Sequence, residues 1–513
     1  MDITILFTLI VVGALCFALR ALPRVGKPLM GHDVWAILLV VDQLRKGEGY
    51  NGATRYFLIE GEHDYPPLFF YVLSLFPSSF LKKYNWAISP LLDSANAVIL
   101  ILTGVFLTGD VRIGAVAGVI YSFTPVVLEE CLIFSMRLFG MVIFNCTMFS
   151  FAYYMFSKDP LFLLFTIAGG ILVLLSHKFA AEVLFLLLLA FTFLEWSYIP
   201  ILALLAVFLG AFIFSGGFYL KVLRGQVAIN IAWLRHQREH YRFIKGGSYV
   251  EGEHAAEERL KTSTQPTTPE EARGASESFA VRLWRSTKDV NPLYWLLRLN
   301  PFNPFGLVAI LPLFLGFQTR DLIVLFWALL TLFFFYAATY LRFLGHYAGR
   351  TQYLDYNAFP AALVCSTFLL ESFSYWKGIV ISVAFVLALI QIGRAWNRAR
   401  TLSRSDDQSL LVEIFDYLRK SPKDGVICLP PSHSYAIPYF TGKKVFYTLS
   451  ARYQEKLSVF EYVLAVPIST LSREYGLNFV ILDRKIVPVE AIDLSDFKPV
   501  MERNDYLLLE KSD

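Results

Sequence analysis

The stretches GHDVW at residues 31–35 and EHDYPPL at residues 62–68 lie within one long polar segment, residues 20–85. An apolar run at residues 3–19 precedes this segment, and another comes after it at residues 86–108. A helix needs roughly 17–25 apolar residues to cross a bilayer, and both runs reach that length. The segment is therefore predicted to be the first loop of a membrane protein, with its acids at the boundary between lipid and water.

The composition supports a membrane protein. Of 513 residues, 56% are hydrophobic and only 17% are charged, and the mean hydropathy is +0.52. The net charge of +4 gives no indication of nucleic acid as a partner. The five cysteines are scattered and match neither a disulfide framework nor a zinc site. The first run lacks a basic start and a cleavage site, so it is expected to be a retained span.

Apolar runs recur through the first three-quarters of the chain and predict about eleven transmembrane helices. They lie at residues 3–19, 86–108, 112–128, 132–156, 160–176, 179–196, 199–220, 305–318, 322–341, 354–374 and 378–394. The predicted fold class is a polytopic α-helical membrane protein with a transmembrane domain at residues 1–394. The tail, residues 395–513, changes composition and predicts a small soluble α/β domain.

The polar segments suggest further elements. The long loop at residues 221–304 is expected to hold a helix in the headgroup region, residues 227–243, and a mobile stretch, residues 253–278. In the tail we expect a helix at residues 408–419 and strands at 425–429, 444–447, 478–483 and 506–510.

The connections between spans alternate between short turns and long or charged segments, so nearly all polar groups lie on one face of the membrane. Arg20, Arg24 and Lys27 come after the first span, and the positive-inside rule would put this face in the cytoplasm. Basic residues that bind a phosphate would bias this count. On the strength of the family resemblance described below, we expect instead that the polar face and the tail are extracytoplasmic.

Asp33 is the candidate catalytic residue. It lies past the first span and directly before a predicted amphipathic helix, residues 34–46. A carboxylate there is accessible and would take a proton from an incoming hydroxyl as a general base. The alternative is an N-cap, because Asp commonly caps a helix that begins with an apolar periodic run. Both roles are compatible with this position.

Glu62, His63 and Asp64 form a second polar group in the first loop. Together they would hold a divalent metal, with Mg, Mn and Zn as candidates, or orient a sugar hydroxyl. Their spacing is not a specific metal signature. The alternative for Asp64 is the cap of a helix at residues 68–81, which the two prolines before Leu68 would start.

Further charged residues end apolar runs on the same face. Glu129 and Glu130 would bind an acceptor or a metal, or would only terminate the third span, and Arg137 lies two helical turns later. His177 and Lys178 interrupt a long apolar stretch, which predicts an anionic partner because cations at membrane depth are costly. The alternative for these two is a turn between helices with a snorkelling lysine.

Arg342, His346 and Arg350 lie at the mouth of two predicted spans. Arginine is suited to contact phosphate with two nitrogens, so these residues predict an anion site. Ordinary anchoring at the membrane interface is the alternative.

Three of these features together resemble the GT-C glycosyltransferase superfamily. They are an acid just after the first span, the Pro-Pro-Leu motif at residues 66–68, and the run RTQYLDYNAFP at residues 350–360. The chain looks most similar to protein O-mannosyltransferases and lipid A aminoarabinose transferases. Tyr65 stands where the latter carry a lysine, and Val34 where the former carry a second acid, so the resemblance does not specify the sugar.

The resemblance implies an inverting transfer of a sugar from a polyprenyl-phosphate donor to a hydroxyl of a glycan, lipid or protein acceptor at the outer face. Asp33 matches the family's first-loop acid, and Arg350 matches its late basic residue. The leaving phosphate would be neutralised by Arg137, His177, Lys178, Arg342, His346 and Arg350.

Two other classes of protein stay open. A transporter or lipid flippase usually shows internal repeats and polar helices that meet at mid-membrane. Here no clear repeat is present and the charges gather at one face, which argues against that class. A non-catalytic subunit that presents a lipid to a partner is the third hypothesis.

Overall fold

The computed structural model describes residues 2–25, 33–235, 303–315, 322–340, 352–371, 375–405, 411–429, 431–450, 467–485, 487, 489 and 492–512. The chain splits into two compact units. The first, the helical unit, holds Met1–Gly31, Pro66–Leu220 and Ser286–Asp406. The second, the loop–tail unit, holds His32–Tyr65, Lys221–Arg285 and Asp407–Asp513. The sequence predicted that the whole first loop belongs to the transmembrane domain, whereas contacts group most of it with the tail.

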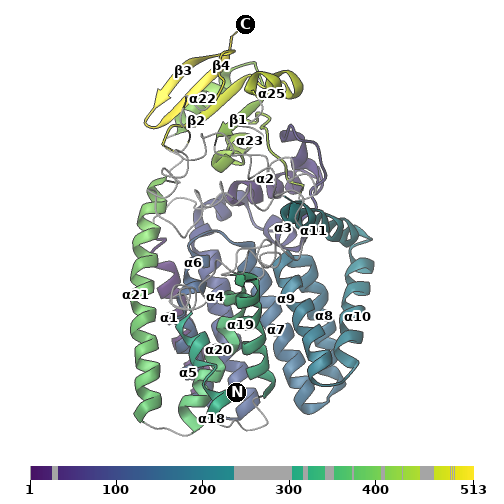
Figure 1. Ribbon diagram of the computed structural model, residues 1–513, viewed down its shortest axis with the longest axis vertical. Helices are drawn as coiled ribbons and strands as arrows, with labels where there is room; N and C mark the ends of the chain where they lie inside the picture. Colours follow the sequence, from purple (N-terminus) through teal and green to yellow (C-terminus); the bar gives the residue numbers. More distant parts are fainter. Residues whose placement is uncertain are drawn as a thin grey trace, which may run out of the picture. The chain divides into compact units, whose positions relative to one another are not determined.

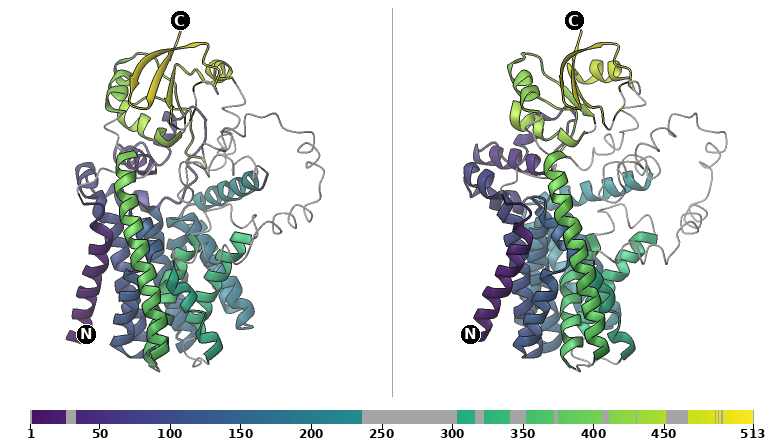
Figure 2. Two further views of the ribbon diagram at one scale, coloured as in Figure 1. Left: turned by 60° about the vertical axis from the view of Figure 1, so that its left-hand side comes forward. Right: turned by 90° about the vertical axis from the view of Figure 1, so that its left-hand side faces the viewer.

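The longer helices of the helical unit run alongside one another (Figures 1 and 2). They are α1 (Ile3–Ala21), α3 (Leu68–Ser74), α4 (Ser78–Thr108), α5 (Val111–Ser122), α6 (Pro125–Cys131), α7 (Met136–Ser157), α8 (Pro160–Ser176), α9 (Lys178–Leu194), α10 (Ile199–Phe214), α17 (Pro304–Val308), α18 (Pro312–Leu315), α19 (Leu322–Tyr340), α20 (Gln352–Glu371) and α21 (Tyr375–Ser405). Helix α11 (Phe218–Arg235) begins in this unit and continues into the other.

Local signals set the helix ends. Between α7 and α8, Lys158 adopts a left-handed conformation with φ of 58° and closes α7. The Asp159 side chain then accepts a hydrogen bond from the Leu161 amide, 2.9 Å away, and Pro160 takes the first helical position. This confirms a short turn between the predicted spans at residues 132–156 and 160–176.

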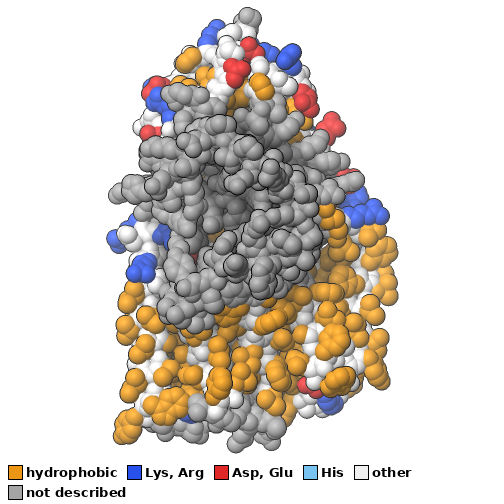
Figure 3. Space-filling model, in the orientation of Figure 1, with side chains coloured by type: hydrophobic (Ala, Val, Ile, Leu, Met, Phe, Trp, Pro, Cys, Tyr) orange, Lys and Arg blue, Asp and Glu red, His pale blue; other side chains and the backbone are white. Residues whose placement is uncertain are grey.

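Hydrophobic side chains predominate over the lower part of the molecule where Figure 3 shows the helices in colour. Leu164 is 62% exposed, Leu209 61% and Phe193 67%, which a water-exposed surface would not tolerate over so many helices. These exposed apolar side chains make the helical unit an integral membrane structure.

By length and composition, four of the described helices can cross a membrane, or up to six if each of two bent pairs is one span. Three shorter apolar helices, Pro160–Ser176, Pro304–Phe314 and Leu322–Ala338, add to these. A mostly helical membrane protein is therefore confirmed, and the number of eleven spans stays a prediction.

Two predicted helices have different bounds in the structure. The run at residues 68–81 is not one helix, because α3 ends at Ser74 and Pro77 caps the start of α4. The span at residues 199–220 ends at Phe214, where Gly216 and Gly217 adopt positive φ before α11 begins. The predicted helix at residues 227–243 is the end of α11 as far as residue 235. Residues 236–243 and 253–278 lie outside the described residues.

The loop–tail unit contains a small sheet in the order β1-β2-β4-β3. Its elements are α2 (Asp33–Arg45), η1 (Gly52–Tyr56), α22 (Val412–Lys420), β1 (Val426–Leu429), η6 (Pro431–His433), α23 (Ala436–Thr441), α25 (Ile468–Tyr475), β2 (Phe479–Asp483), β3 (Phe497–Arg503) and β4 (Tyr506–Lys511). Strands β1 and β2 are parallel, and β4 is antiparallel to both β2 and β3. The predicted C-terminal α/β structure is thus present.

The first loop is built into this sheet. Phe57 and Val426 each form an isolated bridge with Val445, and the Leu58 amide donates to the Val445 carbonyl at 2.9 Å. Ile59 is 3% exposed and belongs to the same core cluster as Ile427 and other sheet residues. The predicted strand at residues 444–447 is therefore a bridging segment between the tail and the first loop, because it pairs at single positions on both sides.

Candidate active site

Asp33 is the first residue of α2, and its side chain is exposed. Residue 32 lies outside the described residues, so the N-cap alternative is not described either. The predicted helix at residues 34–46 is confirmed as α2, but it is largely buried: Val34 and Val40 are 1% and 0% exposed. The rest of α2 is therefore held in place while its first carboxylate stays accessible.

Two phenols of the tail, Tyr435 and Tyr447, lie against each other. The rings of Tyr435 and Tyr447 lie 4.8 Å apart, edge to face. Burial raises the pKa of Tyr447 to about 12, and the negative charge of Asp33 adds to the rise. Burial also raises the pKa of Tyr435 well above its ordinary value, with Tyr447 and Asp33 contributing. Both phenols are therefore protonated hydrogen-bond donors at neutral pH.

Glu62, His63 and Asp64 have separate partners. Glu62 pairs with Lys221 at 2.8 Å. The His63 ring stacks on Tyr50 with centroids 4.4 Å apart. Asp64 is only 5% exposed and accepts a hydrogen bond from the Ser450 hydroxyl at 3.1 Å.

The metal site predicted from these three side chains stays a prediction. Within the described ranges no group of three or more His, Cys, Asp or Glu residues is arranged to hold an ion. The capping alternative for Asp64 is wrong, because the residue at the N-cap of α3 is Pro67 and no side chain bonds there. Asp64 instead ties the first loop to the tail.

In the helical unit, Arg137 lies between two carboxylates. Its Nη1 is 2.5 Å from Glu130 Oε2 and 3.3 Å from Asp355 Oδ2. Asp355 is 2% exposed, and Glu130 also accepts a hydrogen bond from the Ser135 hydroxyl. Since two acids face one guanidinium, the charge of Arg137 is already balanced. From the sequence we expected Arg137 to bind a lipid phosphate, and Asp355 was not among the candidates.

Glu129 points to a different helix from its neighbour. Its Oε1 is 3.1 Å from Arg398 Nη1 on α21. The two adjacent acids therefore hold α6 against α7 on one side and against α21 on the other. Both are engaged within the helical unit, which matches the structural alternative for the pair more closely than a shared metal site.

His177 and Lys178 form the turn between α8 and α9. His177 is buried, and its Nδ1 accepts a hydrogen bond from the Ala180 amide at 3.4 Å, which caps α9. Lys178 is the first residue of α9 and is half-buried. The predicted alternative of an inter-helix turn is thus confirmed for the backbone. Arg342, His346 and Arg350 lie outside the described residues.

Helix α9 carries a further acid that the sequence did not single out. The Tyr353 hydroxyl donates to Glu182 Oε1 at 2.8 Å, one turn beyond Lys178. No local pattern indicated this pair, because its members are 171 residues apart.

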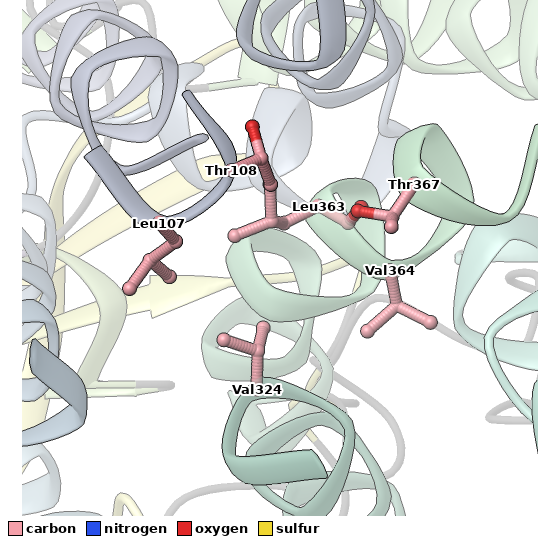
Figure 4. Close-up of a pocket in the computed structure, with 6 residues that line it drawn as sticks. All are labelled: Leu107, Thr108, Val324, Leu363, Val364 and Thr367. Atoms are coloured by element: carbon pink, nitrogen blue, oxygen red, sulfur yellow. The ribbon is translucent and has the colours of Figure 1, made fainter. Parts of the chain in front are cut away.

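A small cavity in the helical unit is lined by Leu107, Thr108, Val324, Leu363, Val364 and Thr367 (Figure 4). Its volume is about 10 Å³, which is the size of a single water molecule. Such a space cannot hold a sugar or a lipid headgroup, so it is a packing defect between helices.

Comparison with solved structures finds similar folds among membrane glycosyltransferases, in agreement with the resemblance that the sequence motifs indicated. The chain is similar to the archaeal oligosaccharyltransferase AglB from Archaeoglobus fulgidus, solved in complex with an inhibitory peptide and a dolichol-phosphate. The likeness covers 94% of this chain and 69% of that chain at 13% identity, with a TM-score of 0.55. A crystal structure of the Archaeoglobus fulgidus oligosaccharyltransferase in the apo form is also similar. That likeness covers 94% of this chain and 70% of that chain at 13% identity, with a TM-score of 0.56.

A weaker likeness links the chain to ArnT from Cupriavidus metallidurans in the apo state, with 10% identity, 98% and 97% coverage and a TM-score of 0.42. No family model and no curated protein match the sequence. At such low identity, the similarity establishes the fold alone.

Proposed function

We propose that the protein is a membrane glycosyltransferase that moves a sugar from a polyprenyl-phosphate-linked donor to an acceptor hydroxyl at the outer face of the membrane. The observation that carries this proposal is the exposed Asp33 carboxylate at the start of α2, in a chain with a GT-C fold. A carboxylate held by a buried helix and open to solvent is suited to receive an acceptor.

The proposed step is a single displacement. The acceptor oxygen forms a bond to the anomeric carbon while the bond from that carbon to the phosphate oxygen breaks. The acceptor proton passes to Asp33, and the polyprenyl phosphate leaves with the electron pair. One displacement on one face of the sugar inverts the anomeric centre.

The lipid phosphate is the second partner in this proposal. The similar AglB structure contains a dolichol-phosphate, and an equivalent phosphate here needs cations at the membrane surface. Among the described residues Lys178 is the candidate. Arg342, His346 and Arg350, which lie outside the described residues, stay candidates from the sequence. Arg137 is a weaker candidate, because Glu130 and Asp355 already balance its charge.

The test is a transfer assay with purified full-length protein in detergent and lipid, using tritiated dolichyl-phosphate-linked hexoses and a mixture of hydroxyl acceptors. We expect Asp33→Asn to abolish transfer while leaving the melting temperature unchanged. Removing a general base lowers rates by roughly 10²–10⁴-fold.

The matched control is Asp42→Asn, on the same helix. Asp42 pairs with Arg45 at 3.1 Å near the other end of α2, so this variant should keep full transfer. Wild-type turnover by Asp33→Asn would show that this carboxylate is not the base.

A further inference from the structure

Large apolar side chains are exposed where α3 is followed by α4 in the helical unit. They are Tyr71, Leu75, Phe76, Phe80 and Tyr84, and Leu75 is 81% exposed. Three of them form an aromatic ladder on successive turns. The ring centroids of Phe76 and Phe80 lie 5.4 Å apart, and those of Phe80 and Tyr84 lie 5.0 Å apart. A contiguous apolar surface of this kind marks a binding surface, whereas single exposed apolar residues do not.

Two lysines accompany the ladder. Lys82 and Lys83 are both exposed, and the Lys83 ammonium lies 5.1 Å from the centroid of the Tyr84 ring. Residues 65–92 contain no Asp or Glu, so the sequence here supplies positive charge only. We call the five apolar residues and these two lysines the corner patch. Aromatic rings beside lysines are typical of protein surfaces at the level of the lipid headgroups.

Helix α4 is longer than the hydrocarbon core of a bilayer requires. Its 31 residues span about 46 Å at 1.5 Å per residue, whereas the core is about 30 Å thick. Residues 86–108 carry one charge, Asp93, which is buried and paired with Arg20. This part of α4 therefore fits the core, and residues 78–85 extend into the headgroup region.

We propose that the corner patch is a binding surface for anionic phospholipid headgroups. Leu91, two helical turns beyond Tyr84, is also exposed, so the patch continues the apolar surface of the helical unit that lipid covers. Lys82 and Lys83 attract negative headgroups, whereas a headgroup without net charge gains nothing from them. The level of the patch favours lipid over an acidic partner protein, because residues 78–85 lie beside the bilayer. This inference does not depend on the proposed function.

The test places a photoreactive p-benzoylphenylalanine at position 75 of the full-length protein, because Leu75 is the most exposed apolar residue of the patch. The protein is reconstituted in vesicles with equal amounts of phosphatidylglycerol and phosphatidylcholine that carry identical acyl chains. Mass spectrometry then counts the two lipid adducts after irradiation. We expect phosphatidylglycerol adducts to exceed phosphatidylcholine adducts roughly tenfold or more, since each lysine near an anionic surface adds several-fold in affinity. The excess should shrink in about 1 M salt, which screens exposed charges.

The double variant Lys82→Gln, Lys83→Gln should bring the ratio of adducts close to one and leave the melting temperature unchanged. The matched control is Lys420→Gln, Lys498→Gln, which removes two exposed lysines of the tail and should keep the excess. Equal adducts with the native lysines, or an excess that persists without Lys82 and Lys83, would overturn the proposal. Adducts to a second protein chain in place of lipid would also overturn it, in favour of a protein partner.

Discussion

Arg20 and Asp93 form an ion pair with both side chains fully buried, the Arg20 Nε lying 2.7 Å from Asp93 Oδ2. Arg20 also donates to the backbone carbonyls of Tyr121 and Thr124, at 3.2 and 3.3 Å. The end of α1 is thereby tied to α4 and to the bend between α5 and α6. Because the first loop leaves the helical unit from the end of α1, this pair fixes its starting point.

The burial of the arginines after the first span also affects how the positive-inside rule applies to this segment. Arg24 is 0% exposed and donates to the Cys131 carbonyl at 3.3 Å, so neither it nor Arg20 is a free interfacial charge. The positive-inside rule concerns basic residues in loops that interact with the membrane surface. Arg20 and Arg24 should therefore not be counted as interfacial positive charges, which leaves only Lys27 of the three basic residues. An extracytoplasmic first loop stays a proposal.

The first prediction concerns the Arg20–Asp93 pair. We expect Asp93→Asn or Arg20→Leu to destabilise the protein by roughly 3–5 kcal/mol, because each leaves a buried charge or its hydrogen-bonding partners unmatched. The double variant Arg20→Leu, Asp93→Leu should lose less than either single one. Thermal unfolding in detergent measures this. The control is Arg112→Leu, since Arg112 pairs with Asp110 while 83% exposed and should contribute about 1 kcal/mol or less.

The second prediction concerns Gly225 on α11. A Cβ at this position would lie 2.4 Å from Asp64 Oδ2, so Gly225→Ala must push the buried carboxylate aside. We expect a loss of roughly 1–3 kcal/mol, measured as a lower melting temperature. The control is Gly393→Ala on α21, where a Cβ meets nothing within 4 Å. If both alanine variants melt like the wild type, α11 does not approach Asp64 as the structure shows.

Helices were predictable wherever an apolar run and its turn residues agreed. Residues 157–160 combine a left-handed C-cap, an Asp N-cap and a first-turn proline, and the structure has the turn there. The errors at residues 68–81 and 199–220 have local causes that the hydropathy pattern hides. Pro77 interrupts the first run and a glycine pair ends the second.

Strand β3 was not predicted, because its residues are mostly exposed and carry charges, which weakens the alternating pattern expected for a strand.

The contacts of the candidate site were also less predictable than the helices. Asp355 meets Arg137 across 218 residues, and Ser450 meets Asp64 across 386. No local spacing indicates such pairs, so Asp355 and Ser450 could be found only from the fold.

The third prediction concerns the place of the first loop in the sheet. Ile59 is buried in the core of the loop–tail unit, so Ile59→Ala should destabilise the tail by roughly 2–5 kcal/mol. Limited trypsin digestion of the full-length protein should then release the tail faster. Val412→Ala, at a position on α22 that is 48% exposed, is the control and should digest like the wild type. Unchanged digestion of both would mean that the tail folds without the first loop.

The fourth prediction separates two cations, Arg137 and Lys178, to which the sequence assigned the same role. Arg137 faces Glu130 and Asp355, so Arg137→Gln should leave two buried acids unmatched and lower the melting temperature. The second change Glu130→Gln should restore part of that loss.

Lys178 begins α9 and is half-buried, so Lys178→Gln should leave the melting temperature unchanged. It should instead raise the KM for the lipid-linked donor roughly tenfold, because a phosphate loses one charge-assisted contact. Donor titrations of each variant, beside thermal unfolding, measure both effects. A stable Arg137→Gln variant with a raised donor KM would assign the phosphate to Arg137 and contradict this division of roles.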